Sequence, residues 1–294
     1  MSGPPNGFPA GPPSGRSALR VVGASVLGPA HVRDGLPNQD ALAWFPESGS
    51  GDRLVVAVSD GHGARLHFRS QTGSALAVAT AVREGAERLP AFDPGGDPAL
   101  DPEEFLAPMA EAVVRAWTAL VLADVERRPF QEEELAAVDE HMGPGFRGEV
   151  EERPEVAYGA TLLIALVAGP TAFFLQVGDG DILVTSAAGT VLPVPGDDRL
   201  QGGATTSLCL PGAEQDFRYG LWRPAEPIPA VALLATDGLK NAFIDDEGFL
   251  EVGAGVREVV GKEGLAALGE MLPGWLSDAG AHSGDDATAA AVAL

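Results

Sequence analysis

Short apolar runs bounded by turn residues occupy both halves of the chain. These runs are rich in Val, Leu, Ala and aromatic residues and are too short for typical core helices, so they predict β-strands. We expect strands at Val21–Val26, Ala41–Phe45, Leu54–Asp60, Ala160–Val167, Thr171–Gly178, Asp181–Ser186, Ala204–Leu210, Val231–Asp237 and Ala287–Leu294. Hairpin-length links between many of these runs favour antiparallel pairing.

Three longer segments have the composition or the spacing of helices. Ala64–Leu89 is rich in alanine, and Glu103–Arg128 carries apolar residues at helical spacing, with Pro108 as a point where the helix could break. A third helical stretch is expected around Gly248–Ala279, and Pro90–Pro102 is expected as a loop. Strands, then helices, then strands again predict an α+β layered domain with mostly antiparallel sheets.

The composition is that of one packed domain. The chain has 294 residues, of which 45% are hydrophobic and 21% charged. Residues 1–19 are rich in Pro and Gly and lack the apolar stretch of a signal peptide, so we expect a flexible tail before a domain at 20–294. Apolar runs such as Leu162–Ala168 fall short of the roughly 20 residues that span a bilayer. The single cysteine, Cys209, excludes an intrachain disulfide and is typical of cytoplasmic proteins.

The charge is strongly negative. Formal net charge is −23, which disfavours nucleic acid and anionic membranes as partners and instead attracts cations, metal ions included. Residues 84–155 hold 19 acidic and 6 basic side chains. Within them, Arg128–Pro154 shows little periodicity, so we expect an exposed acidic insertion around 128–155, most simply a solvated loop.

Four aspartates lie where apolar strands end or begin. Asp60 ends one strand in SDGHG, Asp179 follows another in VGDGD, Asp237 follows a third in ATDGL, and Asp285 precedes the last strand in GDDAT. A single aspartate in such a place is usually a turn or cap residue. Four from distant parts of the chain, gathered at one end of a sheet stack, suit a hard divalent cation such as Mg²⁺ or Mn²⁺.

These motifs together resemble a known family. SDGHG, VGDGD, LLATDGL and GDDAT, in this order, look like the metal-dependent serine/threonine protein phosphatases of the PP2C (PPM) type, and PNQDA fits the family's first acidic motif. The resemblance runs from about Val21 to Leu294. It implies a four-layer αββα sandwich with two central antiparallel sheets flanked by helices. It also implies hydrolysis of phosphoserine and phosphothreonine in proteins by a metal-activated water, in opposition to a serine/threonine kinase.

The resemblance further implies two Mn²⁺ or Mg²⁺ ions, with a third at a weaker position. Its ligand set falls on Asp40, Asp60, the Gly61 carbonyl, Asp179, Asp237 and Asp285. Asp60 would bridge both ions and the Gly61 carbonyl would hold one of them. Asp237 and Asp285 would ligate the other ion.

Three further roles are implied in the same way. Asp40 would support a metal-bound water, and Asp179 together with Asp237 would form the third position. His62 would be the general acid that protonates the leaving oxygen, a role worth about 10²–10⁴-fold in rate. No protein nucleophile is required, and the chain has no G-x-S-x-G motif.

The chain departs from the family pattern at two positions. Gln39 stands where the family has Glu, so it is a candidate weak ligand, directly or through water. Gly35 stands where the family has a phosphate-binding Arg, which leaves Arg33 or His31 as candidates for that role. These departures keep two alternatives open: a catalytically weak phosphatase-like module that binds a partner, and an enzyme of the same fold acting on a small phosphorylated molecule.

Overall fold

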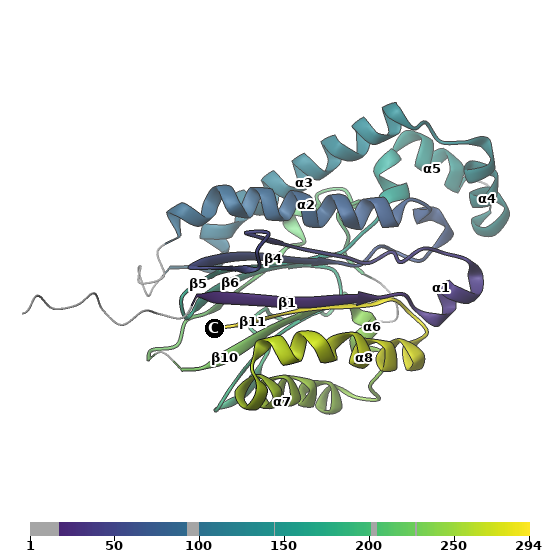
Figure 1. Cartoon of the computed structure of the whole chain (residues 1–294). Coiled ribbons are helices and arrows are strands. Elements are labelled where there is room, and N and C mark those ends of the chain that lie inside the picture. The colour runs from purple at the N-terminus through teal and green to yellow at the C-terminus, as the bar shows by residue number, and fades with distance from the viewer. Residues whose placement is uncertain (1–17, 93–99, 144, 201–204, 227) are drawn as a thin grey trace, which may run out of the picture.

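Two antiparallel sheets stack face to face between helices (Figure 1). The computed structural model describes residues 18–92, 100–143, 145–200, 205–226 and 228–294. One sheet has the order β3-β1-β11-β10-β7-β8, built from Ser50–Gly51, Leu19–Val26, Ala287–Ala293, Ala230–Ala235, Asp181–Ser186 and Gly189–Val191. The other has the order β2-β4-β5-β6-β9, built from Ala41–Phe45, Arg53–Ser59, Leu162–Ala168, Thr171–Val177 and Arg218–Trp222.

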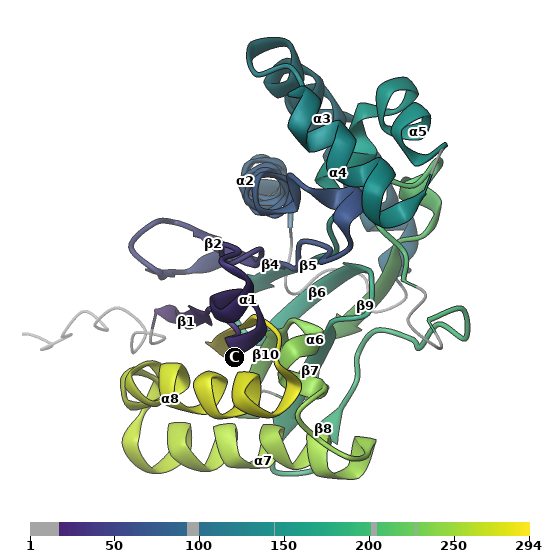
Figure 2. The same ribbon diagram turned by 90° about the vertical axis from the view of Figure 1, so that its right-hand side faces the viewer.

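Helices cover the outer face of each sheet (Figure 2). The helices α2 (Ser70–Arg88) and α3 (Pro102–Arg127) pack on the five-stranded sheet, and α7 (Asp246–Glu263) and α8 (Leu265–Ser283) pack on the six-stranded sheet. The shorter helices are α1 (Pro29–Asp34), α4 (Glu132–Met142), α5 (Phe146–Glu152) and α6 (Asp237–Lys240). Short 3-10 turns lie at Arg65–His67, Leu89–Ala91, Pro154–Tyr158 and Ala213–Gln215. The predicted αββα sandwich is confirmed.

Burial on both faces explains the continuous apolar runs in the sequence. Along β4, the side chains of Val55 and Ala57 face the helices, whereas those of Leu54, Val56 and Val58 face the other sheet. Strands β5 and β10 alternate in the same way between two hydrophobic clusters. Successive side chains of a strand point to opposite faces, so a strand covered on both sides has no polar face to show.

The predicted long helices differ from the observed ones mainly at their ends. The first begins at Ser70 rather than near Ala64, after a 3-10 turn, and α3 runs through Pro108 without a break. The predicted Gly248–Ala279 stretch is two helices, because Gly264 adopts a φ of 89° between α7 and α8. By length and composition alone α3 could cross a membrane, but its apolar side, including Met109 and Trp117, is buried in the core.

The acidic insertion is not a loop. Residues 128–155 contain α4 and α5, and their side chains Leu135, Val138 and Val150 are buried in the hydrophobic cluster beneath α3. A capping box starts α4, where the Gln131 side chain accepts from a backbone N–H and Glu134 bonds back to the Gln131 N–H. The expected solvated loop was therefore wrong. The tail expected at 1–19 lies outside the described residues over 1–17, and β1 already begins at Leu19. The loop expected at Pro90–Pro102 lies outside them over 93–99.

Candidate metal centre

The strand order brings the predicted aspartates to one end of the sandwich. In the five-stranded sheet, Ala41 of β2 pairs with Ser59 of β4, so Asp40 and Asp60 lie side by side just beyond this pair. In the six-stranded sheet, Ala235 of β10 pairs with Asp181 on one side and Ala289 on the other. The residues just outside those pairs are Asp237, Asp179 and Asp285, so both sheets present carboxylates at the same end.

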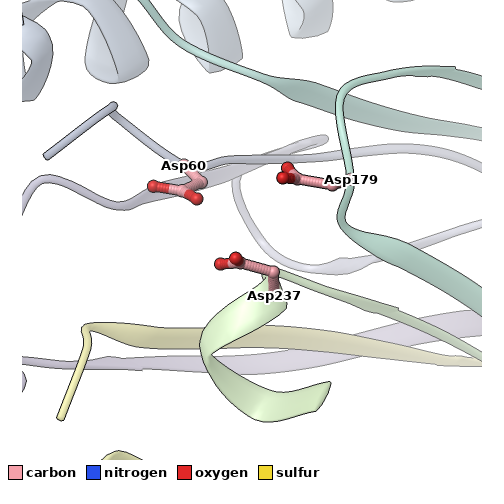
Figure 3. Close-up of side chains that lie close together, drawn as sticks. All are labelled: Asp60, Asp179 and Asp237. Carbon is pink, nitrogen blue, oxygen red and sulfur yellow. The ribbon is translucent and has the colours of Figure 1, made fainter. Parts of the chain in front are cut away.

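Three of these carboxylates converge (Figure 3). Oxygen atoms of Asp60, Asp179 and Asp237 all lie within 4.8 Å of one another. Two oxygens bound to one Mg²⁺ or Ca²⁺ at about 2.0–2.6 Å can be at most roughly 4–5 Å apart. The spacing therefore fits a shared divalent cation, and the all-oxygen donor set suits Mg²⁺ or Mn²⁺.

The electrostatics of the cluster also favour a cation. The pKa of Asp40 is raised from 3.8 to about 7, first by burial and then by the nearby carboxylates of Asp285 and Asp286. The pKa of Asp237 is raised to about 6 by burial and by its acidic neighbours, and burial likewise raises that of Asp60 well above its usual range. Burial without a compensating positive charge disfavours the ionised form. A bound divalent cation would supply that charge.

Asp286 organises the two loops that carry the ligands. Its side chain is 3% exposed, and its Oδ1 accepts from the Gly28 N–H at 2.7 Å. Its Oδ2 accepts from the Gln39 N–H at 2.7 Å and lies 2.8 Å from His31 Nδ1. The loop before Asp40 is thereby tied to the loop that holds Asp285. In the sequence, its position directly after Asp285 is the only signal of this role.

A second tie joins the two sheets directly. The Thr236 hydroxyl, at the end of β10, donates to Asp40 Oδ2 at 2.8 Å and accepts from the Thr288 N–H at 3.0 Å. Asp40 directly precedes β2 of the five-stranded sheet, and its side chain is hydrogen-bonded to Thr236, which follows β10 of the six-stranded sheet. Ligand positions fixed by hydrogen bonds from separate elements are preorganised for metal binding.

A cavity of about 340 Å³ opens over the carboxylates. Four aspartates line it, together with the 61–64 segment, both His62 and His67, and residues 205–210 in part. The pKa of His62 is lowered to about 3, first by burial and then by His67, so its imidazole is neutral at neutral pH in the metal-free protein. The two imidazole rings lie 4.8 Å apart, and His67 Nδ1 donates to the Val156 carbonyl at 2.5 Å.

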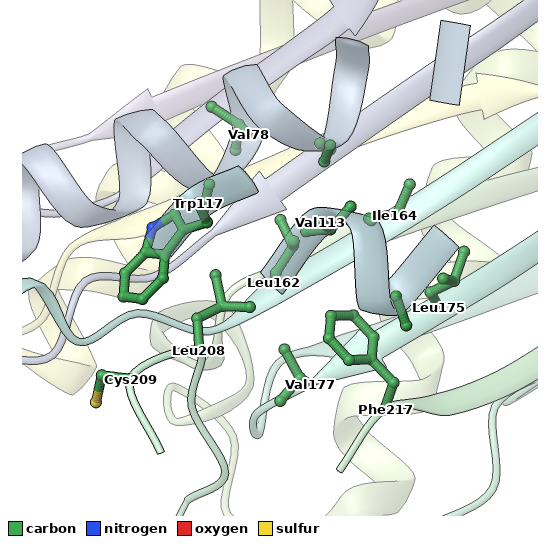
Figure 4. Packing of buried hydrophobic residues seen from close by; sticks show 14 of the residues in the cluster. Val78, Val113, Trp117, Leu162, Ile164, Leu175, Val177, Leu208, Cys209 and Phe217 are labelled. Atoms are coloured by element: carbon green, nitrogen blue, oxygen red, sulfur yellow. The ribbon is translucent and has the colours of Figure 1, made fainter. Parts of the chain in front are cut away.

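The predicted strand Ala204–Leu210 is wrong over the residues described, 205–210. This segment is irregular because its side chains, instead of backbone groups in a sheet, bond to the neighbouring backbone. Thr206 Oγ1 accepts from the Gly178 N–H at 2.8 Å, and Ser207 Oγ donates to the Ala160 carbonyl at 3.1 Å. Leu208 and Cys209 pack into the core below α3 (Figure 4). The strand that sequence reasoning missed, β9, follows shortly after and completes the sheet edge.

The other predicted site residues lie around this centre. A Cβ at Gly61 would come within 2.6 Å of the Gln39 carbonyl, so only glycine allows this approach of two ligand-bearing segments. Arg33 lies on α1 with its side chain 73% exposed and ion-paired to Asp34. His31 is held by Asp286, and Gln39 lines a neighbouring cavity instead of the one over the carboxylates. Direct roles for Arg33 and Gln39 in binding phosphate and metal stay predictions.

Comparison with known proteins agrees with this geometry. A family model described as protein phosphatase 2C matches residues 27–277. The chain belongs to the protein phosphatase 2C family. A search of curated protein sequences finds no match.

Solved structures of the family share the fold. PppA, a regulatory component of the type VI secretion system in Pseudomonas aeruginosa, is 19% identical with a TM-score of 0.58, covering 95% of this chain and 99% of its own. The catalytic domain of the serine/threonine phosphatase PstP in complex with two manganese ions is also 19% identical, with a TM-score of 0.57 and coverage of 95% and 100%. The Mycobacterium tuberculosis phosphatase PstP/Ppp is 18% identical, with a TM-score of 0.55 and coverage of 94% and 99%.

Proposed function

We propose that this protein is a Mn²⁺- or Mg²⁺-dependent phosphatase that hydrolyses phosphoserine and phosphothreonine in proteins. The observation that carries the proposal is the convergence of Asp60, Asp179 and Asp237 beneath an open cavity, with oxygen atoms within 4.8 Å of one another. Family membership supports the same reaction. The manganese ions named for the PstP domain support a two-ion site with the same chemistry in this chain.

The carboxylates would hold the ions. Asp60 would contact both ions, and Asp237 and Asp285 would hold one of them. Asp40, which accepts a hydrogen bond from Thr236, would orient water. When bound, divalent ions lower the pKa of the attacking water and neutralise charge on the phosphoryl oxygens. Without them the same carboxylates repel a phosphate dianion, so turnover is expected to require metal.

His62 would serve the leaving group. Its imidazole lines the same cavity as the carboxylates, within reach of a substrate bound over them. Burial keeps the His62 imidazole neutral in the free protein. A phosphate dianion bound nearby would favour the charged form, so the imidazole would take up a proton at that stage and then donate it to the leaving oxygen. A phosphoprotein made by a serine/threonine kinase of the cytoplasm is the proposed substrate. The lone cysteine supports that compartment.

Hydrolysis of p-nitrophenyl phosphate tests the reaction most simply. The wild type should turn over with Mn²⁺ or Mg²⁺ and stop in excess chelator, and Asp60→Asn should be inactive at all metal concentrations. Asp278→Asn, at an exposed position of α8, is the matched control and should keep full activity. Release of phosphate from phosphoserine peptides, compared with small phosphoesters, then separates a protein phosphatase from a small-molecule enzyme. A folded wild type that is inactive at millimolar Mn²⁺ would instead favour a binding module.

A further inference from the structure

A second cavity lies beside the metal cavity. It has a volume of about 320 Å³ and shares Gly63, Ala64 and His67 with the metal cavity, so the two meet along this short segment. Its other walls come from the loop before Gln39, from the start of α2, and from the segment that joins α3 to α4. Glu134 of α4, in the region that the sequence predicted as a loop, also lines it.

Two of its three arginines are already neutralised. The Arg69 guanidinium donates to both carboxylate oxygens of Glu134, at 3.1 and 2.9 Å, and to the Tyr158 hydroxyl at 2.9 Å. Arg128 pairs with Asp124 at 2.6 Å. These pairs fix the wall of the cavity and leave little net charge on it.

Arg65 is different. It lies on the 3-10 turn Arg65–His67, its side chain is exposed, and it makes no hydrogen bond or ion pair with any residue that the structure describes. A guanidinium has five N–H donors in a planar fork that matches a carboxylate or a phosphate. Arg65 therefore offers an anion site within the second cavity, on a segment that also lines the metal centre.

Gln39 supplies an independent sign of a ligand. Its side chain is 8% exposed and lines the second cavity, yet its Oε1 is buried without a hydrogen-bond partner among the described residues. A buried polar atom normally finds a partner, because otherwise it loses its hydrogen bonds to water without any replacement. Because this oxygen has almost no accessible surface, the carboxamide would turn toward the cavity to accept from an N–H group of a bound molecule.

We propose that the second cavity binds the substrate peptide beside its phosphorylated residue, and that Arg65 selects an anionic side chain there. Gln39 Oε1 would accept a hydrogen bond from a main-chain N–H of the same peptide. An extended peptide advances about 3.5 Å per residue, so a neighbour within three residues of the phosphoserine can reach the adjoining cavity. This inference rests on the proposed function, because it requires the phosphorylated residue to sit at the metal centre.

Charge selection by Arg65 can be measured with peptides. In one peptide series, a single Glu is placed in turn at each of the three positions on either side of the phosphoserine, and each peptide is compared with the one that has Gln at the same position. A second phosphoserine at the best position then compares a phosphate with a carboxylate. At one position or more the wild type should prefer Glu over Gln by about fivefold in kcat/KM, mainly through KM, the range of an exposed ion pair. Arg65→Gln should bring this ratio to about one, and Arg65→Glu should prefer Lys. Arg83→Gln, at an exposed site on α2, should keep the wild-type ratio.

Three results would overturn the inference. One is a wild type with no preference at any position, and another is an Arg65→Gln enzyme that keeps the preference. The third is an equal loss in Arg65→Gln with both peptides and with p-nitrophenyl phosphate, which would place Arg65 on the reacting phosphate. If the wild type hydrolyses no substrate, the proposed function fails; binding of the labelled Glu and Gln phosphopeptides, measured by fluorescence anisotropy, then decides. Equal affinities in that measurement would refute the subsite, and a preference lost in Arg65→Gln would support it.

Discussion

Replacing Asp237, a proposed metal ligand, with Asn should stabilise the protein when no metal is bound. The pKa of Asp237 is raised from 3.8 to about 6, first by burial and then by the carboxylates of Asp179 and Asp285. At neutral pH this side chain is therefore charged at a cost, which Asn avoids at nearly the same volume. The Asn241 amide, which donates to Asp237 Oδ2 at 2.9 Å, can donate to the Asn oxygen as well.

The size of the effect follows from the pKa. Each pH unit between the unfolded and folded values is worth about 1.4 kcal/mol, so the difference corresponds to about 3 kcal/mol at pH above 6. Loss of the contact between Asp237 and Asp60 reduces the gain. We expect the free energy of unfolding to rise by about 1–3 kcal/mol, which is roughly 2–6 °C in melting temperature at about 2 °C per kcal/mol for a domain of this size.

Thermal unfolding in excess chelator and in millimolar Mn²⁺ provides the assay. In chelator at pH 7.5, Asp237→Asn should melt at a higher temperature than the wild type. The exposed control Asp278→Asn should melt at the same temperature as the wild type. In Mn²⁺ the order should reverse, because only the wild type and the control bind the ion and gain its binding free energy. A variant that melts below the wild type in chelator would refute the electrostatic reasoning. Equal stabilisation of all three proteins by Mn²⁺ would refute the ligand assignment.

Two further predictions concern the same cluster. Because the pKa values of Asp40 and Asp60 are raised, their carboxyl groups support the metal-free fold fully only below about pH 4, and this stability is lost as the pH rises towards 7. Mn²⁺ should therefore raise the melting temperature more at pH 8 than at pH 5.5. An equal rise at both pH values would contradict these pKa shifts. Asp286→Asn should lower the free energy of unfolding in Mn²⁺ by about 2–4 kcal/mol, because three donors then share one remaining acceptor oxygen and at least one buried N–H is left unpaired. Urea unfolding measures this loss. An unchanged urea midpoint would show that the loops are held by other contacts.

The sequence predicted the convergence of the aspartates because strand ends leave strong local signals. The β4 and β10 runs are apolar over Leu54–Val58 and Ala230–Ala235, as strands buried on both faces must be, and each is followed by a hydroxyl residue, an aspartate and a glycine. In an antiparallel sandwich, strands that leave at one end are neighbours of strands that enter there. Asp60, Asp237 and Asp285 could therefore be expected to meet without knowledge of the tertiary structure.

The remaining features depend on contacts that no local pattern records. The helices α4 and α5 are short and rich in charged residues, and Arg69 binds Glu134 across 65 residues of sequence. The 205–210 segment has the composition of a strand, but hydrogen bonds from distant loops hold its backbone outside the ladder. In each case a long-range partner decides the outcome.

The adjacent residues Asp285 and Asp286 show how the fold divides labour between identical side chains. Asp286 is turned inward, where two backbone N–H groups and His31 surround its carboxylate, so its charge is compensated by the protein. Asp285 faces the cavity, and its pKa is raised because burial and nearby charge oppose its ionised form. The Asp286 carboxylate thus fixes the loops around the site, whereas the Asp285 carboxylate keeps a charge that a bound cation would offset. A cluster of this kind holds its ligands in place before the metal arrives, and the electrostatic cost of doing so in the metal-free state becomes part of its affinity for the ion.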